Sequence, residues 1–353
     1  MDGATPSHPA DSPYIPVTRS ATLLPIVLAA LAALAGLVPH APAFDPFNRN
    51  PAVAPEPDKE DLETLTRVQI FLDENLFTPG KIDGRIGEFT RKAVAHYNAA
   101  HGISPLDNWA AVLDRSAALV PNVFTTYTIR EEDSAFVNPG MPTSPEAQSK
   151  LKILNYRRFS ELVSERFHCD EPFLEKINPD TNVHSLRPGD TLNVPNVISP
   201  FLIEDVPKYN KYPEDPALSA RNVIIDTGVK IAAVYDPDGT LVASFPITPG
   251  EERFIHRGHW KLVTMVSTPE FRWDDSMLNQ GVRSESAFQL PPGPNNPVGV
   301  LWAGTSKSGI GMHGTASPET IGRARSAGCI RLANWDAIRL PTILRPGAQV
   351  EIR

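Results

Sequence analysis

Cysteine is scarce in this chain, which has only Cys169 and Cys329 among its 353 residues. Two thiols exclude the disulfide-dense framework of small secreted domains. A single bridge would require Cα atoms about 6 Å apart, and the two cysteines fall in different predicted domains. We therefore expect two separate thiols, of which Cys169 is a half-buried small residue without a chemical role.

Long runs of Lys and Arg are also absent, and the formal net charge is −8. This balance argues against a dedicated nucleic-acid-binding protein. The candidate zinc ligands His256, His259, His313 and Cys329 match no compact metal-binding spacing. We therefore expect neither a metal nor a cofactor.

Only one apolar run is long enough to be a signal peptide or to span a membrane. Residues 21–38 contain no charged side chain, and Ala41-Pro42-Ala43 follows in the form of a signal-peptidase site. Residues 1–43 are predicted as a signal peptide, or as an uncleaved N-terminal anchor, because such a run just spans a bilayer. Both alternatives place the remainder outside the cytoplasmic membrane, in the periplasm or cell envelope.

Proline is abundant, with 36 residues, and it is concentrated near the N-terminus and between the segments with regular patterns. Residues 44–60 are predicted as an extended linker. Residues 61–118 are predicted as a small helical domain, with a turn PGKIDG at 79–84 and a helix end near Gly102. The first helix is indicated by apolar residues at helical spacing: Leu62, Leu65, Val68, Phe71 and Leu72.

Two further units follow. Residues 124–197 are predicted to run strand–helix–helix–strand, with a Pro/Ser-rich insertion at 138–149 after the first strand. Residues 198–219 are predicted as a linker. Residues 220–353 contain short β-branched runs punctuated by Gly, Asp and Pro, which predict a mostly β domain. The expected fold class is therefore multidomain α+β.

The stretch from His313 to Cys329 carries the strongest chemical signal. A cysteine thiol acts as an acyl-transfer nucleophile only as thiolate, and its ordinary pKa near 8.5 leaves little thiolate at neutral pH. A histidine within hydrogen-bond reach accepts the proton. Gly328 permits close backbone approach, so that backbone N–H groups can hold an oxyanion. Arg331 adds fixed positive charge or grips a substrate carboxylate.

The motif resembles a known family. His313-Gly314-Thr315, followed by Ser326-Ala-Gly-Cys-Ile-Arg-Leu, is similar to the signature of the L,D-transpeptidase (YkuD) catalytic domain. The resemblance covers about 130 residues and implies Cys329 as nucleophile and His313 as general base. It also implies Ser326, Gly328 and Gly314 as motif residues around the oxyanion site, and Arg331 as a substrate-binding residue.

The family implies a peptidoglycan L,D-transpeptidase of cell-wall biogenesis, which forms a thioester at Cys329 and then 3→3 crosslinks between stem peptides. Its partners would be stem peptides and glycan strands, with no nucleic acid. The same site would act as an L,D-carboxypeptidase with water as acceptor, or as a protein-to-wall anchoring enzyme with a protein amine. A non-catalytic peptidoglycan-binding wall protein is the remaining alternative. Ala327 departs from the family, since many members have His there.

Two resemblances support the wall assignment. Residues 61–118 resemble the three-helix peptidoglycan-binding domain, on Phe77 and the turn from Pro79 to Gly84, although a helical spacer without affinity is the alternative. Residues 124–197 resemble a LysM domain, which implies binding to the N-acetylglucosamine backbone of peptidoglycan. The match is carried by Tyr127, Leu174, Asn178, Leu186, Pro188, Gly189, Leu192, Val194 and Pro195.

Overall fold

The computed structural model describes residues 56–59, 61–323 and 328–353. These residues lie within the unit formed by residues 52–353. The predicted signal peptide or anchor at 1–43 and most of the linker at 44–60 lie outside the described residues. Within the described ranges, no helix has both the length and the apolar character needed to cross a membrane.

The first described segment is helical, as the apolar spacing predicts. The Asp61 side chain caps the first helix by accepting a hydrogen bond of 2.9 Å from the Thr64 backbone N–H. In the following turn, Gly84 has φ +63°, and an added Cβ would lie 2.2 Å from the Leu62 side chain. The turn therefore requires glycine. The helices are α2 (Leu62–Glu74), α3 (Glu88–Ala100) and α4 (Ala110–Leu119).

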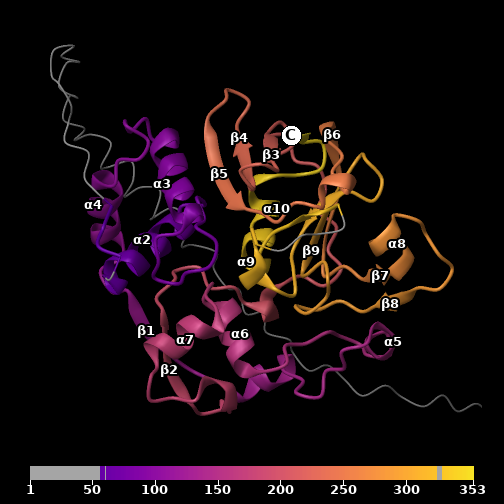
Figure 1. Cartoon of the computed structure of the whole chain (residues 1–353), viewed down its shortest axis with the longest axis horizontal. Helices are drawn as coiled ribbons and strands as arrows, with labels where there is room; N and C mark the ends of the chain where they lie inside the picture. The colour runs from indigo at the N-terminus through magenta and orange to yellow at the C-terminus, as the bar shows by residue number, and fades with distance from the viewer. Residues whose placement is uncertain (1–55, 60, 324–327) are drawn as a thin grey trace, which may run out of the picture. The chain divides into compact units, whose positions relative to one another are not determined.

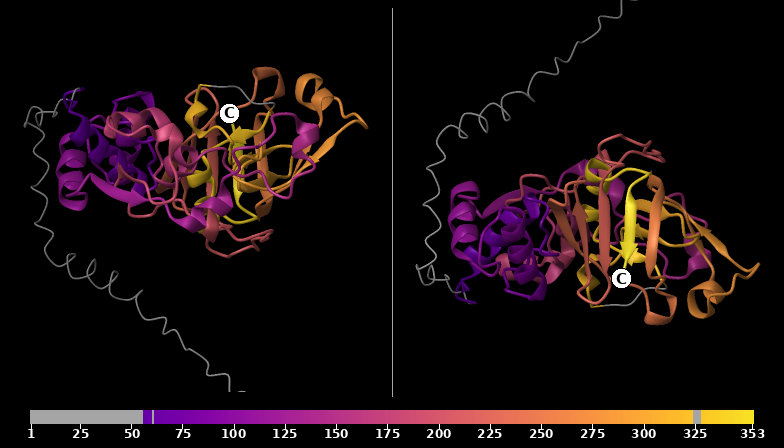
Figure 2. Two further views of the ribbon diagram at one scale, coloured as in Figure 1. Left: turned by 90° about the horizontal axis from the view of Figure 1, so that it is seen from below. Right: turned by 90° about the horizontal axis from the view of Figure 1, so that it is seen from above.

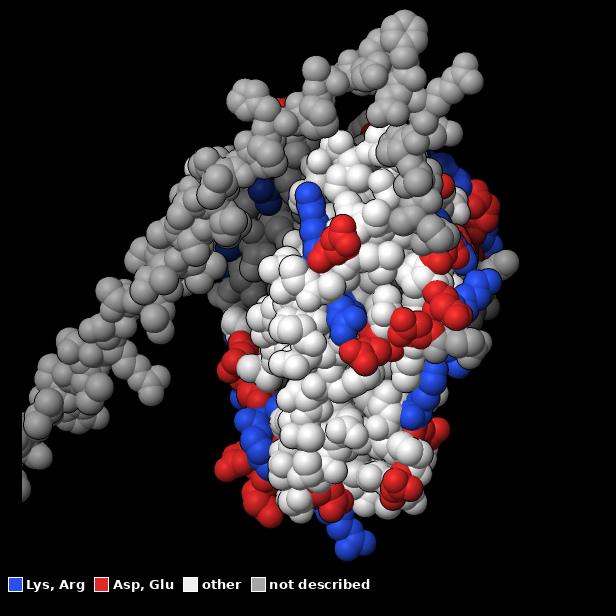
Figure 3. Space-filling model, turned by 90° about the vertical axis from the view of Figure 1, so that its left-hand side faces the viewer, with Lys and Arg blue, Asp and Glu red and all other residues white. Residues whose placement is uncertain are grey.

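Charged side chains of both signs are interspersed on the face of the molecule seen in Figure 3. Helices α2 and α3 carry the i,i+4 pairs Arg67–Glu63 and Lys92–Glu88. Such exposed pairs each stabilise a helix by only about 0.3–0.5 kcal/mol. Burial of the apolar stripe therefore holds these helices in place, and Val68, Phe71 and Leu72 are at most 1% exposed.

The next segment has the predicted order strand–helix–helix–strand. Strands β1 and β2 pair antiparallel from Phe124↔Pro195 to Thr128↔Thr191. The Asn178 carboxamide joins the second helix to this ladder, because Nδ2 donates to the Leu174 and Asn193 carbonyls while Oδ1 accepts from Asn193 N–H. The elements are β1 (Phe124–Thr128), η2 (Glu131–Phe136), α5 (Pro145–Gln148), α6 (Phe159–Arg166), α7 (Glu171–Ile177), η3 (Val183–Ser185) and β2 (Thr191–Pro195).

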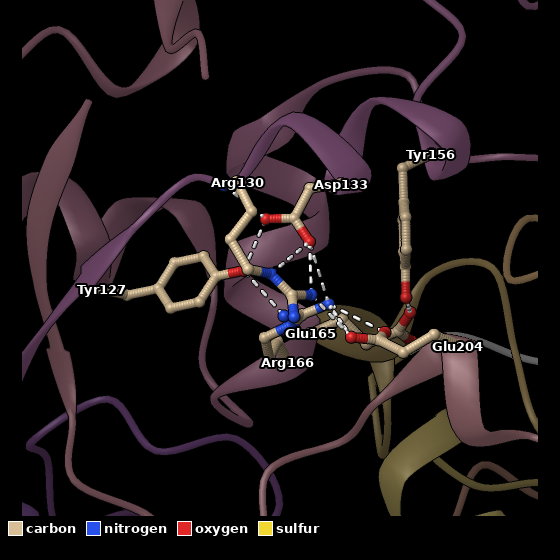
Figure 4. A network of polar contacts seen from close by, with 7 residues as sticks. All are labelled: Tyr127, Arg130, Asp133, Tyr156, Glu165, Arg166 and Glu204. Atoms are coloured by element: carbon tan, nitrogen blue, oxygen red, sulfur yellow. Dashed lines mark hydrogen bonds and ion pairs between the residues drawn. The ribbon is translucent and has the colours of Figure 1, made fainter. Parts of the chain in front are cut away.

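Residues 198–219, predicted as a linker, are instead packed into the fold. Arg166 is only 3% exposed and donates to the Glu204 carboxylate at 2.9 and 3.0 Å and to the Tyr127 hydroxyl at 2.7 Å, as Figure 4 shows. Buried Asp133 completes this cluster and accepts from Arg130. Around η4 (Ile203–Asp205), three apolar side chains enter the same core as the helical segment: Phe201, Ile203 and Val206.

The last segment forms a mostly β domain around an eight-stranded sheet of order β11-β10-β9-β6-β12-β3-β4-β5. Neighbours pair antiparallel except for β12 with β3 and β10 with β11, which are parallel. Figure 2 shows these strands side by side. The sheet strands are β3 (Asn222–Asp226), β4 (Ile231–Tyr235), β5 (Leu241–Pro246), β6 (Gly258–Ser267), β9 (Leu301–Thr305), β10 (Gly311–His313), β11 (Ile330–Arg331) and β12 (Gln349–Ile352).

Strand β6 curls the sheet. Its first part pairs with β12 and its second part with β9, and the register shifts between Leu262 and Thr264. An extra residue at this point bends the strand and increases its twist. The elements outside the sheet are η5 (Glu252–Phe254), β7 (Phe271–Trp273), α8 (Asp275–Gln280), β8 (Phe288–Leu290), η6 (Pro318–Thr320), α9 (Asn334–Ala337) and α10 (Leu340–Ile343).

The helical segment covers the edge of this sheet at β5. The Thr78 N–H donates to the Ser244 carbonyl at 2.9 Å, and the Ser244 N–H donates to the Leu76 carbonyl at 2.8 Å. Helix α3 packs beside the same strand (Figure 1). Covering an edge strand satisfies its backbone groups and removes a site for unwanted pairing.

Buried polar contacts reinforce this arrangement. Asp73 of α2 accepts hydrogen bonds of 2.9 Å from His168 Nδ1 and Arg339 Nη2, which come from the other two segments. Glu165 of α6 accepts from the Tyr156 hydroxyl and, at 2.8 Å, from Asn334 Nδ2 of α9. Removing one partner of such a buried contact leaves an uncompensated polar group. The three segments therefore depend on one another for stability.

Glu165 makes the stability contributed by these contacts between segments depend on pH. Burial raises the pKa of its carboxyl from 4.5 to about 8, against the hydrogen bonds from Tyr156 and Asn334. The folded protein thus binds this proton more tightly than the unfolded chain does. The contribution to stability is fully present below pH 4.5 and is lost as the pH rises towards 8. Its slope is at most about 1.4 kcal/mol per pH unit.

Glu165→Gln reproduces the protonated carboxyl with one acceptor and one donor, so we expect it to remove this slope. Urea unfolding between pH 5 and 8.5 should show the variant gaining stability relative to the parent as the pH rises. Exposed Glu131→Gln is the matched control and should leave the pH dependence unchanged. Parallel stability curves for Glu165→Gln and the parent would contradict the assignment.

Candidate active site

The parallel pairing of β10 with β11 brings the sequence-predicted residues together. The register joins Met312 to Ile330 and His313 to Arg331. Alternate residues of a strand face the same side. Met312 and Ile330 accordingly enter the core behind the sheet, whereas His313, Cys329 and Arg331 line one cavity in front of it.

His313 is held in one tautomer by the backbone of the next residue, Gly314. Its ring Nδ1 lies 2.6 Å from the Gly314 carbonyl oxygen. A carbonyl only accepts, so Nδ1 carries the proton and donates it. Burial lowers the pKa of His313 to about 4, with a contribution from Arg331 and against the hydrogen bond to Gly314. The imidazole is therefore neutral at neutral pH, with its lone pair on Nε2.

A tryptophan fixes the plane of this ring. Trp302 lies opposite His313 in the β9–β10 ladder, and the two rings stack with centroids 5.7 Å apart and an interplanar angle of 21°. Trp302 and Trp273 both line the cavity. Both tryptophans are therefore wall residues of the cleft.

Cys329 immediately precedes β11 and is half-buried. Its Sγ lies 3.2 Å from the Gly309 carbonyl, to which the thiol donates. Burial raises the pKa of the thiol, although the Gly311 backbone N–H and Arg331 act in the opposite direction. At rest the cavity therefore holds a protonated thiol and a neutral imidazole.

The backbone just before Cys329 lies very close to a facing loop. Gly328 has φ +108°, a conformation that strongly favours glycine. On the facing loop, a Cβ added to Gly250 would lie 2.4 Å from Gly328 Cα. Gly250 is thus required for the approach of the two chains. The motif residue Ser326 lies outside the described residues.

The backbone of Arg331 is hydrogen-bonded to the segment that precedes this facing loop. Its N–H donates to the Thr248 carbonyl at 3.0 Å, and its carbonyl accepts from Thr248 N–H at 2.9 Å. Burial lowers the pKa of the guanidinium, and Cys329 opposes this. The positively charged side chain lies half-buried in the wall of the same cavity as the thiol.

The cavity has a volume of about 930 Å³. Its far wall is the β7–α8–β8 excursion, where Phe271 pairs with Leu290 across the hairpin. Behind that hairpin lie Met141 and Leu154, which belong to the segment between β1 and α6 and pack against Phe271, Trp273 and Phe288. The insertion in the second segment therefore supports a wall of the candidate site.

The structure adds residues that the sequence did not single out. Gly309 and Gly311 contact Cys329, and Gly250 approaches the preceding Gly328, but isolated glycines give no signal of their partners. The supporting role of residues 141–154 depends on long-range packing and has no local motif. For metals, the described part of the chain contains no group of three or more His, Cys, Asp or Glu side chains able to hold an ion. His256 and His259 are exposed.

Comparison with known proteins assigns the last segment. The model of the YkuD-type L,D-transpeptidase catalytic domain matches residues 220–352. Residues 220–352 are an L,D-transpeptidase catalytic domain. The prediction of an enzyme of this class is thereby confirmed, as is its mostly β fold. The match does not extend to the peptidoglycan-binding and LysM assignments, which stay predictions.

Two curated proteins carry the same family name. One, named as a candidate L,D-transpeptidase YkuD of Bacillus licheniformis, is 27% identical over 192 residues, or 54% of this chain and 92% of that protein. This alignment is longer than the matched domain and so includes residues before 220. The other, of the same name from Bacillus subtilis, is 29% identical over 138 residues, or 39% of this chain and 69% of that protein.

Solved structures show a more limited similarity. An L,D-transpeptidase from Mycobacterium smegmatis has a TM-score of 0.30 at 17% identity, over 38% of this chain and 58% of that one. L,D-transpeptidase 3 from Mycobacterium tuberculosis, in complex with a faropenem-derived adduct, has a TM-score of 0.31 at 13% identity, over 48% and 76%. The chain thus spans less than two thirds of the first structure. The family assignment depends on the sequence match.

The raised thiol pKa predicts how the L,D-transpeptidase domain reacts with a small alkylating agent. Alkylation of Cys329 by iodoacetamide should increase with pH, with a midpoint above the ordinary thiol pKa, because burial disfavours the thiolate. Mass spectrometry of a Cys169→Ala variant follows the single thiol, and Cys329→Ser gives the background. A midpoint well below 8 would show a preformed thiolate instead.

Proposed function

We propose that this protein is a peptidoglycan L,D-transpeptidase that uses Cys329 as nucleophile and His313 as general base. The main observation that supports this proposal is that a thiol and a neutral, Nδ1-protonated imidazole line one cavity at the β10–β11 pair. Family members act on peptidoglycan stem peptides, which identifies the class of substrate. The residue roles follow from the chemistry of the side chains.

The first stage is acylation. His313 Nε2 takes the thiol proton while Cys329 Sγ attacks the carbonyl carbon of the third residue of a donor stem, at its bond to a D-amino acid. Backbone N–H groups around Gly328 stabilise the oxyanion. The tetrahedral intermediate collapses, the C–N bond breaks, and the imidazolium returns its proton to the leaving amine. A thioester on Cys329 and a free D-amino acid result.

The second stage is transfer to an amine. The side-chain amine of a neighbouring stem attacks the thioester carbonyl, His313 accepts the amine proton, and the C–S bond breaks to restore the thiol. The product is a 3→3 crosslink. Water as acceptor would give L,D-carboxypeptidase activity, and a protein amine would anchor that protein to the wall.

The preceding segments fit a role in holding the wall polymer. We propose that residues 61–118 act as a peptidoglycan-binding domain and residues 124–197 as a LysM-like domain that contacts glycan. The strand–helix–helix–strand order of the second segment supports this. An enzyme of this kind acts in the cell envelope or periplasm, and residues 1–43 would direct its export, either as a cleaved signal peptide or as an anchor through residues 21–38.

The reaction is tested with purified protein and muropeptides. Wild-type protein should convert tetrapeptide stems into 3→3 dimers and release a D-amino acid, whereas Cys329→Ala should lose this activity by at least about 1,000-fold, because the covalent route is removed. Cys169→Ala is the matched control and should retain it. Liquid chromatography with mass spectrometry identifies the donor, the acceptor and the new bond.

A carbapenem provides a second readout of the same nucleophile. We expect a covalent adduct on Cys329 in the wild type and in Cys169→Ala, and no adduct in Cys329→Ala. Equal crosslinking by wild type and Cys329→Ala, or an intact thiol after carbapenem exposure of folded protein, would refute the proposal.

Arg331 is proposed to bind the carboxylate of the donor stem. Arg331→Gln should raise KM for a donor with a free carboxylate by about tenfold or more, because a charge-assisted hydrogen bond is lost. A donor amidated at that carboxyl should be affected less. Steady-state kinetics with the two donors make the comparison, and equal losses for both would exclude carboxylate recognition by Arg331.

A further inference from the structure

Asn334 connects the His313 site to the rest of the fold. It is fully buried and begins α9, and its carboxamide makes four hydrogen bonds. Its Oδ1 accepts from the Val300 N–H at 3.2 Å and from the Thr315 N–H at 3.1 Å. Its Nδ2 donates to Glu165 Oε1 at 2.8 Å and to the Pro294 carbonyl at 3.2 Å. Its two N–H donors and both oxygen lone pairs are therefore used.

One of these bonds acts on the peptide unit that orients the base. The Gly314 carbonyl, which accepts from His313 Nδ1, and the Thr315 N–H belong to the same planar peptide group. Asn334 holds the N–H end of that group, so the carbonyl end stays directed at the imidazole. Rotation of this peptide would remove the acceptor that selects the Nδ1-protonated tautomer.

The glycines next to Asn334 show that close approach of its carboxamide is built into the fold. A Cβ added to Gly314 would lie 2.1 Å from Asn334 Oδ1, and one added to Gly299 would lie 2.0 Å from it. Real Cβ atoms do not approach so closely. Gly314, predicted from the sequence as an oxyanion or motif residue, is thus required here to make room for Asn334.

We propose that Asn334 is a positioning residue for the acyl-transfer reaction, which fixes the tautomer of His313 through the Gly314–Thr315 peptide. It acts through its Oδ1 acceptor, while Glu165 of α6 and the Pro294 carbonyl hold its Nδ2. The second segment thereby contributes to the orientation of the catalytic base. This inference rests on the pair of His313 and Cys329 proposed above.

Two substitutions separate the acceptor from the packing. Asn334→Asp keeps an oxygen for the Thr315 and Val300 N–H groups, whereas Asn334→Leu has similar size and no acceptor. Asn98→Leu is the matched control, because Asn98 is also fully buried and donates two side-chain hydrogen bonds, in the helical segment. Near-UV circular dichroism establishes that each variant is folded.

The first readout is the imidazole itself. In protein labelled with ¹⁵N-histidine, the two ring nitrogens give distinct signals that report which of them carries the proton, and His313→Gln assigns those of residue 313. Wild type, Asn334→Asp and Asn98→Leu should show the Nδ1-protonated tautomer at pH 7. Folded Asn334→Leu should show a mixture of tautomers, which a purely structural role for Asn334 would not produce.

The second readout is the rate of Cys329 alkylation by iodoacetamide at pH 7 in the Cys169→Ala background. Asn334→Leu should react on the order of 100-fold more slowly, the loss expected for a misplaced catalytic group, while Asn334→Asp should stay within about threefold of the parent. This readout needs no peptidoglycan. If the wild type forms no crosslinks but the variants show the alkylation rates expected here, the proposed function is rejected and this inference still stands.

A folded Asn334→Leu with the wild-type tautomer and alkylation rate would overturn the inference. If Asn334→Leu does not fold, Asn334→Asp provides the test. A folded Asn334→Asp that loses the single His313 tautomer refutes the role of the acceptor. A folded Asn334→Asp that keeps the single tautomer supports the role of the acceptor. If neither variant folds, the wild type decides, since an Nε2-protonated His313 would exclude the proposed orientation.

Discussion

Two very short parallel strands determine the geometry of this protein's site. β11 has only two residues, yet its register on β10 sets Cys329, His313 and Arg331 on the cavity side and Met312 and Ile330 in the core. A shift of one residue would exchange the two faces. Burial of Met312 and Ile330, at most 1% exposed, therefore specifies the register that the chemistry needs.

Local sequence signals predicted much of the fold and the core of the site. Helical spacing of apolar residues predicted α2. The sequence also indicated the turn glycines, the strand–helix–helix–strand order and the β character of residues 220–353. The spacing of His313 and Cys329 indicated the pair, because the motif is contiguous. Local patterns did not indicate that Phe201, Ile203 and Val206, within the predicted linker at 198–219, are buried in the core.

Contacts between distant segments could not be predicted in this way. Asn334 carries no local signal for its bonds to Thr315 and Glu165, because the latter lies 169 positions away. Gly314 was predicted around the oxyanion site, whereas the space its missing Cβ leaves is filled by the Asn334 carboxamide. A residue pattern can identify which side chains react, but the groups that orient them come from packing of the whole unit.

The electrostatics of the site keep the Cys329 thiol protonated at rest, so that it is not permanently activated as a thiolate. Burial lowers the pKa of His313 and raises that of Cys329, so both groups are neutral at rest. Forming an ion pair in this setting is unfavourable, so in the proposed reaction the thiol would lose its proton only as a substrate carbonyl accepts the sulfur lone pair. A neutral thiol is also less prone to oxidation than a thiolate. The proposed reaction would depend on accurate orientation of His313 as the base, and His313 is held by a strand, a stacked tryptophan and a clamped peptide together.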